Sequence, residues 1–311
     1  MEKQKLIDEI NKLRKQKNAV IMAHYYQEAE IQDIADVVGD SLALAQWAEK
    51  TDADIIVLCG VHFMGETAKI LSPDKKVLIP DENAGCSLAD SCPADEFEKF
   101  VKSHPDHTVI SYVNTTAAVK ALTDVVVTST NAKKIVDQFP KNAKIIFGPD
   151  KNLGNYINSV TGREMLLWNG ACHVHEQFSV EKLIELKTEN PDAEIVAHPE
   201  CKSVILKLAD YVGSTQGILN YVTKSDKTKF LVVTESGILH QMEKANPQKT
   251  FIPVPPEFEG KTCMCNECKY MRLNTLEKLY LCLRDEKPEI KIDEKLREKA
   301  VKPILRMLQM S

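Results

Sequence analysis

Cysteines are the residues of this 311-residue chain whose type and spacing most directly suggest chemistry. Five of the nine lie in three short turns that recur along the chain: NAGCS with Cys86, NGACH with Cys172, and KTCMCNEC with Cys263, Cys265 and Cys268. A structural zinc site normally uses local cysteine pairs, and the chain has a single CxxC pair, which ends at Cys268. Three widely spaced cysteines better suit an iron–sulfur cluster that keeps one iron open to substrate as a Lewis acid.

The other four cysteines are interpreted as non-ligands. Cys59, Cys201 and Cys282 lie inside apolar patterns or close to them, and a lone cysteine is most often a small buried hydrophobe. Cys92 lies close enough to Cys86 to compete for a metal, although the following proline suggests a turn. Whether Cys263 and Cys265 form a disulfide or are inert is left open by the sequence.

Polar side chains follow three similar apolar segments, AVIMAHYYQ, TVISYVNTT and EIVAHPEC. Their candidate functional residues are His24, Tyr26, Tyr112, Asn114, His198 and Glu200. Glu200 is the candidate general base, with Tyr26 and Tyr112 as proton carriers. Burial is expected to raise the pKa of the Glu200 carboxyl, with a nearby histidine opposing that change.

A serine follows each of these segments at a similar distance. Counted from His24, Asn114 and His198, the spacings are 17, 15 and 16 residues, and the serines are Ser41, Ser129 and Ser214. Each precedes an amphipathic pattern, so each is expected to be a helix N-cap. Three capped helix starts around one cavity would bind phosphate or carboxylate groups.

These motifs belong to a threefold repeat. Each third of the chain alternates apolar strand patterns with helical patterns and ends in a cysteine-bearing turn, which predicts a parallel sheet with helices on its faces. The expected fold class is α/β, with three pseudo-symmetric three-layer αβα units and mostly parallel sheets around a central iron–sulfur site. The expected units are residues 1–88, 89–174 and 175–274, and a C-terminal helix within 275–311 is expected to pack on the first.

Composition excludes several classes of protein. The chain has 40 Lys and Arg residues against 45 Asp and Glu residues, a formal charge of −5, and no long basic run that would indicate nucleic-acid binding. Its apolar runs are far shorter than the ~20 residues of a membrane span. The N-terminus lacks a signal-peptide pattern, so a cytoplasmic protein with reduced cysteines is expected.

From about Ala19 to Leu279 the chain resembles the quinolinate synthase family in its A-subunit form, iron–sulfur enzymes of NAD biosynthesis. The matching motifs are AHYYQ, GDSLALA, GVHFMGETAKIL, AGCSLADSCP, YVNTTA, VTSTNA, FGPDKNLG, GACHVHE, AHPEC, GSTQGIL, TESGILHQ and CKYMRLNTLEKL. The resemblance implies a transferase that condenses iminosuccinate with dihydroxyacetone phosphate to give quinolinate, phosphate and water. It also implies a [4Fe–4S] cluster held by Cys86, Cys172 and Cys268.

The same resemblance implies substrate-contacting residues, carried over position by position: His24, Tyr26, Ser41, Tyr112, Asn114, Ser129, His175, His198, Glu200, Ser214 and Thr215. Of these, Glu200, Tyr26, Tyr112 and His198 are expected to be catalytic. A transient contact with an enzyme that supplies iminosuccinate is also expected. Two other functions remain as alternatives, another hydro-lyase with an open iron and a non-catalytic metal-binding redox sensor that uses CMCNEC as its switch.

Overall fold

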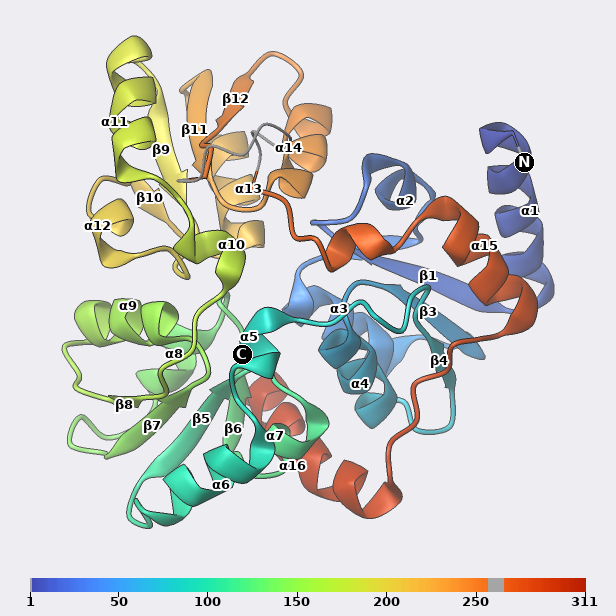
Figure 1. The fold of residues 1–311 in the computed structure, drawn as a ribbon, viewed down its shortest axis with the longest axis horizontal. Helices are drawn as coiled ribbons and strands as arrows, with labels where there is room; N and C mark the ends of the chain where they lie inside the picture. Colours follow the sequence, from blue (N-terminus) through green and yellow to red (C-terminus); the bar gives the residue numbers. More distant parts are fainter. Residues whose placement is uncertain (1, 257–265) are drawn as a thin grey trace.

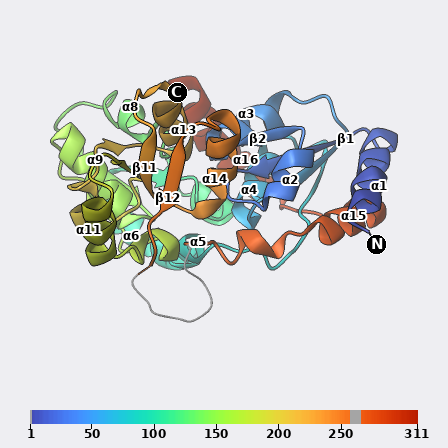
Figure 2. The same ribbon diagram turned by 90° about the horizontal axis from the view of Figure 1, so that it is seen from above.

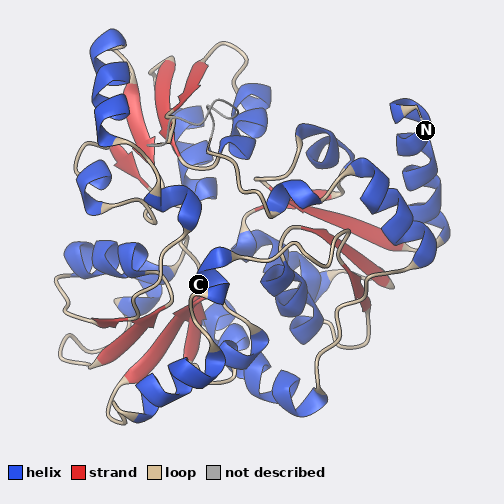
Figure 3. Cartoon of the chain, in the orientation of Figure 1, coloured by secondary structure: helices blue, strands red, loops and turns tan. Residues whose placement is uncertain are grey.

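The computed structural model describes residues 2–256 and 266–311, and it has three α/β units that surround a common centre (Figure 1). Each unit contains a four-stranded parallel sheet with helices on both sides (Figure 3). The predicted α/β fold with three parallel-sheet units is therefore confirmed. The expectations for Cys263 and Cys265 lie outside the described residues. No helix in the described part of the chain is long and apolar enough to cross a membrane.

The three sheets have the same strand order, in which the first strand of each unit pairs with the second on one side and the third on the other. The first sheet is β2-β1-β3-β4, with β1 Ala19–His24, β2 Val37–Gly39, β3 Ile55–Cys59 and β4 Lys76–Leu78. The second is β6-β5-β7-β8, with β5 Thr108–Tyr112, β6 Val125–Val127, β7 Ile145–Gly148 and β8 Leu166–Leu167. The third is β10-β9-β11-β12, with β9 Glu194–Ala197, β10 Tyr211–Val212, β11 Lys229–Val233 and β12 Thr250–Pro253. The unit boundaries themselves stay predictions.

A helix precedes every strand, because parallel neighbours need crossover connections. In the first unit these are α1 Lys3–Gln16, α2 Ala29–Ile34, α3 Ser41–Lys50 and α4 His62–Leu71, and α5 Ser87–Asp90 follows. The second has α6 Ala94–Lys102, α7 Ala117–Lys120, α8 Ala132–Val136 and α9 Lys151–Thr161, then α10 His173–Glu176. The third has α11 Val180–Glu189, α12 Ser203–Leu206, α13 Thr215–Lys224, the 3₁₀ helix η1 Ser236–Ile238 and α14 Leu239–Ala245.

One hydrogen bond to an aspartate side chain repeats in all three units. An aspartate just before the second strand accepts a hydrogen bond through Oδ2 from a backbone N–H of the first strand, at 2.8 Å in each case. The pairs are Asp36 with Ile21, Asp124 with Val109, and Asp210 with Ile195. The bond fixes the start of each sheet in the same way, so the sequence repeat is also a structural repeat.

The segment 275–311, expected to form a helix that packs on the first unit, forms two helices, α15 Leu276–Asp285 and α16 Glu294–Met310, and the 3₁₀ turn η2 Met271–Leu273 precedes it. Helix α15 packs against α1 at one end of the molecule (Figure 2). Helix α16 instead lies against α7 and β6 of the second unit as well as α4 of the first. Its buried face, with Ala300, Ile304 and Met307, joins the two units in one apolar core.

Candidate metal and substrate site

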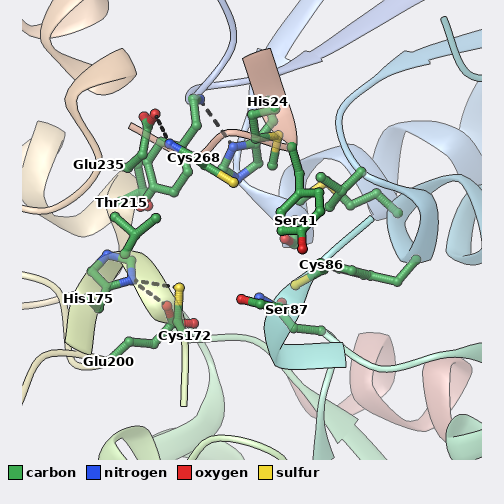
Figure 4. A pocket seen from close by; sticks show the side chains of 18 of the residues that line it. His24, Ser41, Cys86, Ser87, Cys172, His175, Glu200, Thr215, Glu235 and Cys268 are labelled. Carbon is green, nitrogen blue, oxygen red and sulfur yellow. Dashed lines mark hydrogen bonds and ion pairs between the residues drawn. The ribbon is translucent and has the colours of Figure 1, made fainter. Parts of the chain in front are cut away.

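A cavity with about 700 Å³ of atom-free space lies where the three units meet (Figure 4). Its walls include every predicted site residue except Ser214: His24, Tyr26, Ser41, Cys86, Tyr112, Asn114, Ser129, Cys172, His175, His198, Glu200, Thr215 and Cys268. The structure therefore brings thirteen of the fourteen predicted residues to one place.

The cavity lies at the carboxyl ends of the central strands. His24 is the last residue of β1, Tyr112 is the last of β5, and His198 directly follows β9. Strand order reverses beside these strands, and open parallel sheets bind their ligands at such switch points. Each unit thus contributes polar side chains to the cavity through the same element.

Three cysteines from three units line this cavity at the starts of short helical turns. Cys86 and Cys172 are the N-cap residues of α5 and α10, and Cys268 lies just before η2. Backbone N–H groups lower the pKa of each thiol: those of Ala89 and Leu88 at Cys86, that of His175 at Cys172, and those of Met271 and Tyr270 at Cys268. Donors aimed at a sulfur suit a metal-bound thiolate, because hydrogen bonds to the sulfurs tune such sites.

Burial nevertheless raises the pKa of all three thiols, to about 12 at Cys86. The charges of the sulfurs on one another add to this effect, since Cys86 and Cys268 both raise the pKa of Cys172. Without a metal the thiols are therefore protonated at neutral pH. A bound metal would displace these protons, as metal ligation by cysteine requires.

Backbone bonds identify the three cysteines as equivalent. In each unit, the residue that opens the helix after the third strand donates its N–H to the carbonyl two residues before the cysteine. The pairs are His62 to Ala84 at 2.7 Å, Lys151 to Gly170 at 2.8 Å, and Ser236 to Asn266 at 3.1 Å. By this register Cys268 occupies the place in the third unit that Cys86 and Cys172 occupy in the other two.

The ligand atoms around the cavity limit which metal groups it could hold. Among the described residues, one trio of ligand atoms lies within 4.8 Å of one another, from Cys172, His175 and Glu200. The sulfurs of Cys86, Cys172 and Cys268 do not form such a trio, so they do not surround one ion tetrahedrally. Each sulfur nevertheless comes from a different unit and lines the same cavity, so a metal group held by all three would have to be larger than one ion.

Glu200 is fully enclosed and paired with histidine. Its Oε2 lies 2.7 Å from Nδ1 of His175 and 3.8 Å from Nδ1 of His198. Burial raises the pKa of the carboxyl, but the attraction of His175 and His198 and the Tyr112 hydrogen bond outweigh burial and lower the pKa to about 2. The expectation of a raised pKa for Glu200 is therefore wrong, because His175 lies closer than the HPE motif alone suggested.

The neighbouring rings are neutral at physiological pH. Burial lowers the pKa of His24 and of His198 to about 3, although Glu200 opposes this shift. Burial also raises the pKa of the Tyr26 and Tyr112 hydroxyls well above the usual value. These four side chains can donate or accept hydrogen bonds without adding charge to the cavity.

Hydrogen bonds link groups of different units across the cavity. The Tyr26 hydroxyl lies 2.8 Å from Oγ1 of Thr215 and 2.9 Å from that of Thr234, and His198 Nε2 lies 3.2 Å from Ser129 Oγ. Oε1 of Glu200 and Oδ1 of Asn114 are buried without a hydrogen-bond partner. Buried polar atoms are normally paired, so these two oxygens are available to a ligand.

The three serines do not share the predicted capping role. Asp40, not Ser41, caps α3, and Asn131 rather than Ser129 occupies the N-cap position of α8. Ser214 does cap α13, accepting from Gly217 N at 3.1 Å, but it does not line the cavity. The expectation of three serine caps is thus wrong for two of them, because Asp40, one residue before Ser41, and Asn131, two residues after Ser129, take the N-cap positions, while both serines line the cavity.

Sequence reasoning missed several cavity residues. Ser87 Oγ lies 2.6 Å from His173 Nδ1, which joins the first two units directly beside their cysteines. Glu235 and Tyr270 also line the cavity. Their position in the sequence could have identified Ser87 and His173, because each directly follows a cysteine in equivalent turns.

The cysteines interpreted as non-ligands are buried elsewhere. Cys59, Cys92, Cys201 and Cys282 are each at most 1% exposed, and none lines the cavity. Burial raises the pKa of each of these thiols. Their surroundings are those of small apolar core residues.

The chain is similar along nearly its whole length to proteins of one family. The family model described as "Quinolinate synthetase A protein" matches residues 8–309. Proteins named "Quinolinate synthase" from Chloroherpeton thalassium and from a Synechocystis strain are each 60% identical over 306 residues. These alignments cover 98% of this chain and 94% and 95% of those proteins. A third so named, from Thermosynechococcus vestitus, is 58% identical over 306 residues, with 98% and 95% coverage.

Proposed function

Because the chain belongs to the quinolinate synthetase A protein family, we propose that it is a quinolinate synthase of NAD biosynthesis. The reaction is the condensation of iminosuccinate with dihydroxyacetone phosphate, with loss of phosphate and water and closure of the pyridine ring. One observation carries this proposal: cysteines from three units and an ionised, enclosed carboxylate line a single cavity.

We propose a [4Fe–4S] cluster as the resident cofactor, held by Cys86, Cys172 and Cys268. Their equivalent places in three units and the N–H groups around each sulfur support this choice. The chemistry that such a cluster supplies is Lewis-acid polarisation of a substrate oxygen at an iron without a protein ligand. Each thiol must lose its proton when the cluster binds, so loading should release protons.

The cavity binds anionic substrates without a basic side chain, since no lysine or arginine is among its described lining residues. Carboxylate and phosphate oxygens would instead accept hydrogen bonds from the hydroxyls of Ser41, Ser129 and Thr215 and from the two neutral histidines. The ten-residue helices α3 and α13 begin beside this cavity, and their N-terminal N–H groups favour anions. Hydroxyls and amides also impose less charge on a reacting imine than lysines would.

Proton transfer is assigned to Glu200. Its carboxylate is ionised and Oε1 has no hydrogen-bond partner, so it can accept a proton from bound substrate, and the lowered pKa makes it a weak base until substrate binds. His175 and Tyr112 hold the other side of the carboxylate, and neutral Tyr26 and Tyr112 can pass protons to leaving water. Enclosure of these groups limits hydrolysis of the imine.

We also propose a cytoplasmic location and a transient contact with an enzyme that oxidises aspartate. An imine hydrolyses readily in water, so a short path from its source to this cavity would preserve it.

The test is anaerobic purification of the full chain with iron and sulfide analysis, followed by assay of quinolinate and phosphate. The proposal expects a brown protein that forms both products from the two substrates. Iron-loaded protein that dehydrates a hydroxy acid but releases no phosphate would favour a different open-iron hydro-lyase. Zinc without iron and sulfide would contradict the proposed cofactor.

A further inference from the structure

Two buried carboxylates accept hydrogen bonds from the backbone of two of the cysteines and have no part in the proposed reaction. Asp150 comes shortly after β7 in the second unit, and Glu235 comes shortly after β11 in the third. Both are fully buried. They belong to the motifs FGPDKNLG and TESGILHQ, to which the sequence assigned no role.

The two carboxylates use their oxygens in the same way. Oδ1 of Asp150 accepts from Leu153 N at 2.7 Å, and its Oδ2 accepts from Cys172 N at 3.1 Å. Oε2 of Glu235 accepts from Gly237 N at 2.6 Å, and its Oε1 accepts from Cys268 N at 3.0 Å and also from Nη2 of Arg272 at 3.3 Å. In each unit one oxygen caps the following helix and the other binds the backbone of the cysteine.

The first unit has no carboxylate at the equivalent position. Val61 occupies the equivalent position, one residue before His62, and α4 has no side-chain cap. The repeat is therefore broken at one of three places, and the sheet geometry alone does not require the carboxylate. Where it is present, it joins the end of the third strand to the cysteine-bearing turn.

We propose that Asp150 and Glu235 are positioning residues that fix Cys172 and Cys268 for the metal group. This inference rests on the proposed function, in which those cysteines are ligands. A cysteine whose backbone is held at the start of a helical turn keeps its sulfur directed into the cavity. Loss of the carboxylate contact would also leave a buried N–H without an acceptor. Partners that orient ligands typically account for about 10–100-fold in metal affinity.

The test variants are Asp150→Asn and Glu235→Gln. Asparagine caps a helix about as well as aspartate, so the capping oxygen at position 150 can be kept. Its amide nitrogen then replaces the oxygen that accepted from Cys172, and a donor cannot accept that bond. Matched controls are Asp124→Asn and Asp210→Asn, the same kind of change at carboxylates of the same two units that bind the strand starts.

The measurement is the rate at which anaerobically reconstituted full-length protein loses iron to a chelator, followed by visible absorption. Both test variants should lose iron about 10–100-fold faster than wild type, whereas both controls should match wild type. Thermal melting of the metal-free proteins checks folding, and if Asp150→Asn does not fold, Glu235→Gln decides the question.

Iron loss from a folded test variant at the rate of its control would overturn the positioning role. A wild-type protein that takes up no iron would instead contradict the proposed function, and this inference with it. The two failures are distinguished by the wild-type sample alone.

Discussion

The two edges of the three sheets differ in how faithfully they repeat. At the edge where the strands start, Asp36, Asp124 and Asp210 make the same backbone bond with the same spacing of 15 residues. At the opposite edge, the equivalent strand ends provide a histidine and tyrosine, a tyrosine and asparagine, and a histidine and glutamate. Repetition therefore marks what each unit needs to fold, and divergence marks where the units divide the chemistry.

The cysteines are an instructive exception, because they repeat at the divergent edge. Three equivalent residues on one cavity indicate a ligand that is shared by the units, while the non-equivalent polar residues indicate an asymmetric substrate. A shared metal group bound by one cysteine from each unit accounts for both patterns. Substitutions at the two edges should therefore have different effects.

The largest effect is expected at the repeated cysteines. Changing Cys86, Cys172 or Cys268 to Ser should abolish the visible iron–sulfur absorption and all quinolinate formation, because each unit supplies one ligand. The matched controls Cys59→Ser, Cys201→Ser and Cys282→Ser alter buried thiols away from the cavity and should keep the absorption. A full cluster in Cys268→Ser protein would show that the third ligand is misassigned.

The next largest effect is expected at Glu200. Glu200→Gln should keep the cluster and bind substrate but lower kcat by about 10²–10⁴-fold, the usual contribution of a general base. Because the pKa of Glu200 is about 2, its titration should not set an acid limb near neutral pH. Glu176→Gln, outside the cavity lining, is the control. Near-normal kcat with an unchanged pH profile would remove Glu200 from the mechanism and direct attention to Tyr26 or Tyr112.

A smaller effect is expected at the start of α13, where two adjacent residues separate folding from binding. Thr215 faces the cavity, whereas Ser214 caps the helix. Thr215→Val should raise KM for the anionic substrates about tenfold through loss of one hydrogen bond, and loss of the bond to the Tyr26 hydroxyl should also lower the free energy of unfolding by about 1 kcal/mol. Ser214→Ala should lower the free energy of unfolding by a similar amount, about 1 kcal/mol, and leave KM unchanged. An unchanged KM in Thr215→Val would indicate a purely structural threonine.

The smallest effect on activity is expected at the sheet edge where the strands start. Asp124→Asn removes a charged acceptor of the Val109 N–H, so it should lower the free energy of unfolding by about 1–2 kcal/mol in urea titration. Turnover under stabilising conditions should match wild type. A large fall in kcat with normal stability would mean that the two edges are not functionally distinct.

Much of this arrangement could be predicted from the sequence, because it depends on local pattern. Apolar runs that end in polar clusters place His24, Tyr112 and His198 at strand ends, and the periodicity gives parallel sheets. The caps could not be assigned at the level of single residues, because Asp40 and Asn131 compete with the serines for the same positions.

Contacts between segments that are far apart in the sequence could not be predicted either. The 2.7 Å contact of His175 with Glu200 joins α10 to the end of β9, and it reverses the expected pKa direction of the carboxyl. The bonds from Cys172 N and Cys268 N to carboxylates depend on where separate turns meet. Helix α16 likewise bridges two units through a surface that no local pattern specifies.

A metal group held jointly by Cys86, Cys172 and Cys268 can be located directly in an anomalous difference map collected at the iron absorption edge from crystals of anaerobically reconstituted protein. A single multi-iron peak among these three sulfurs is expected. A peak confined to Cys172, His175 and Glu200, the compact trio of ligand atoms, would contradict it.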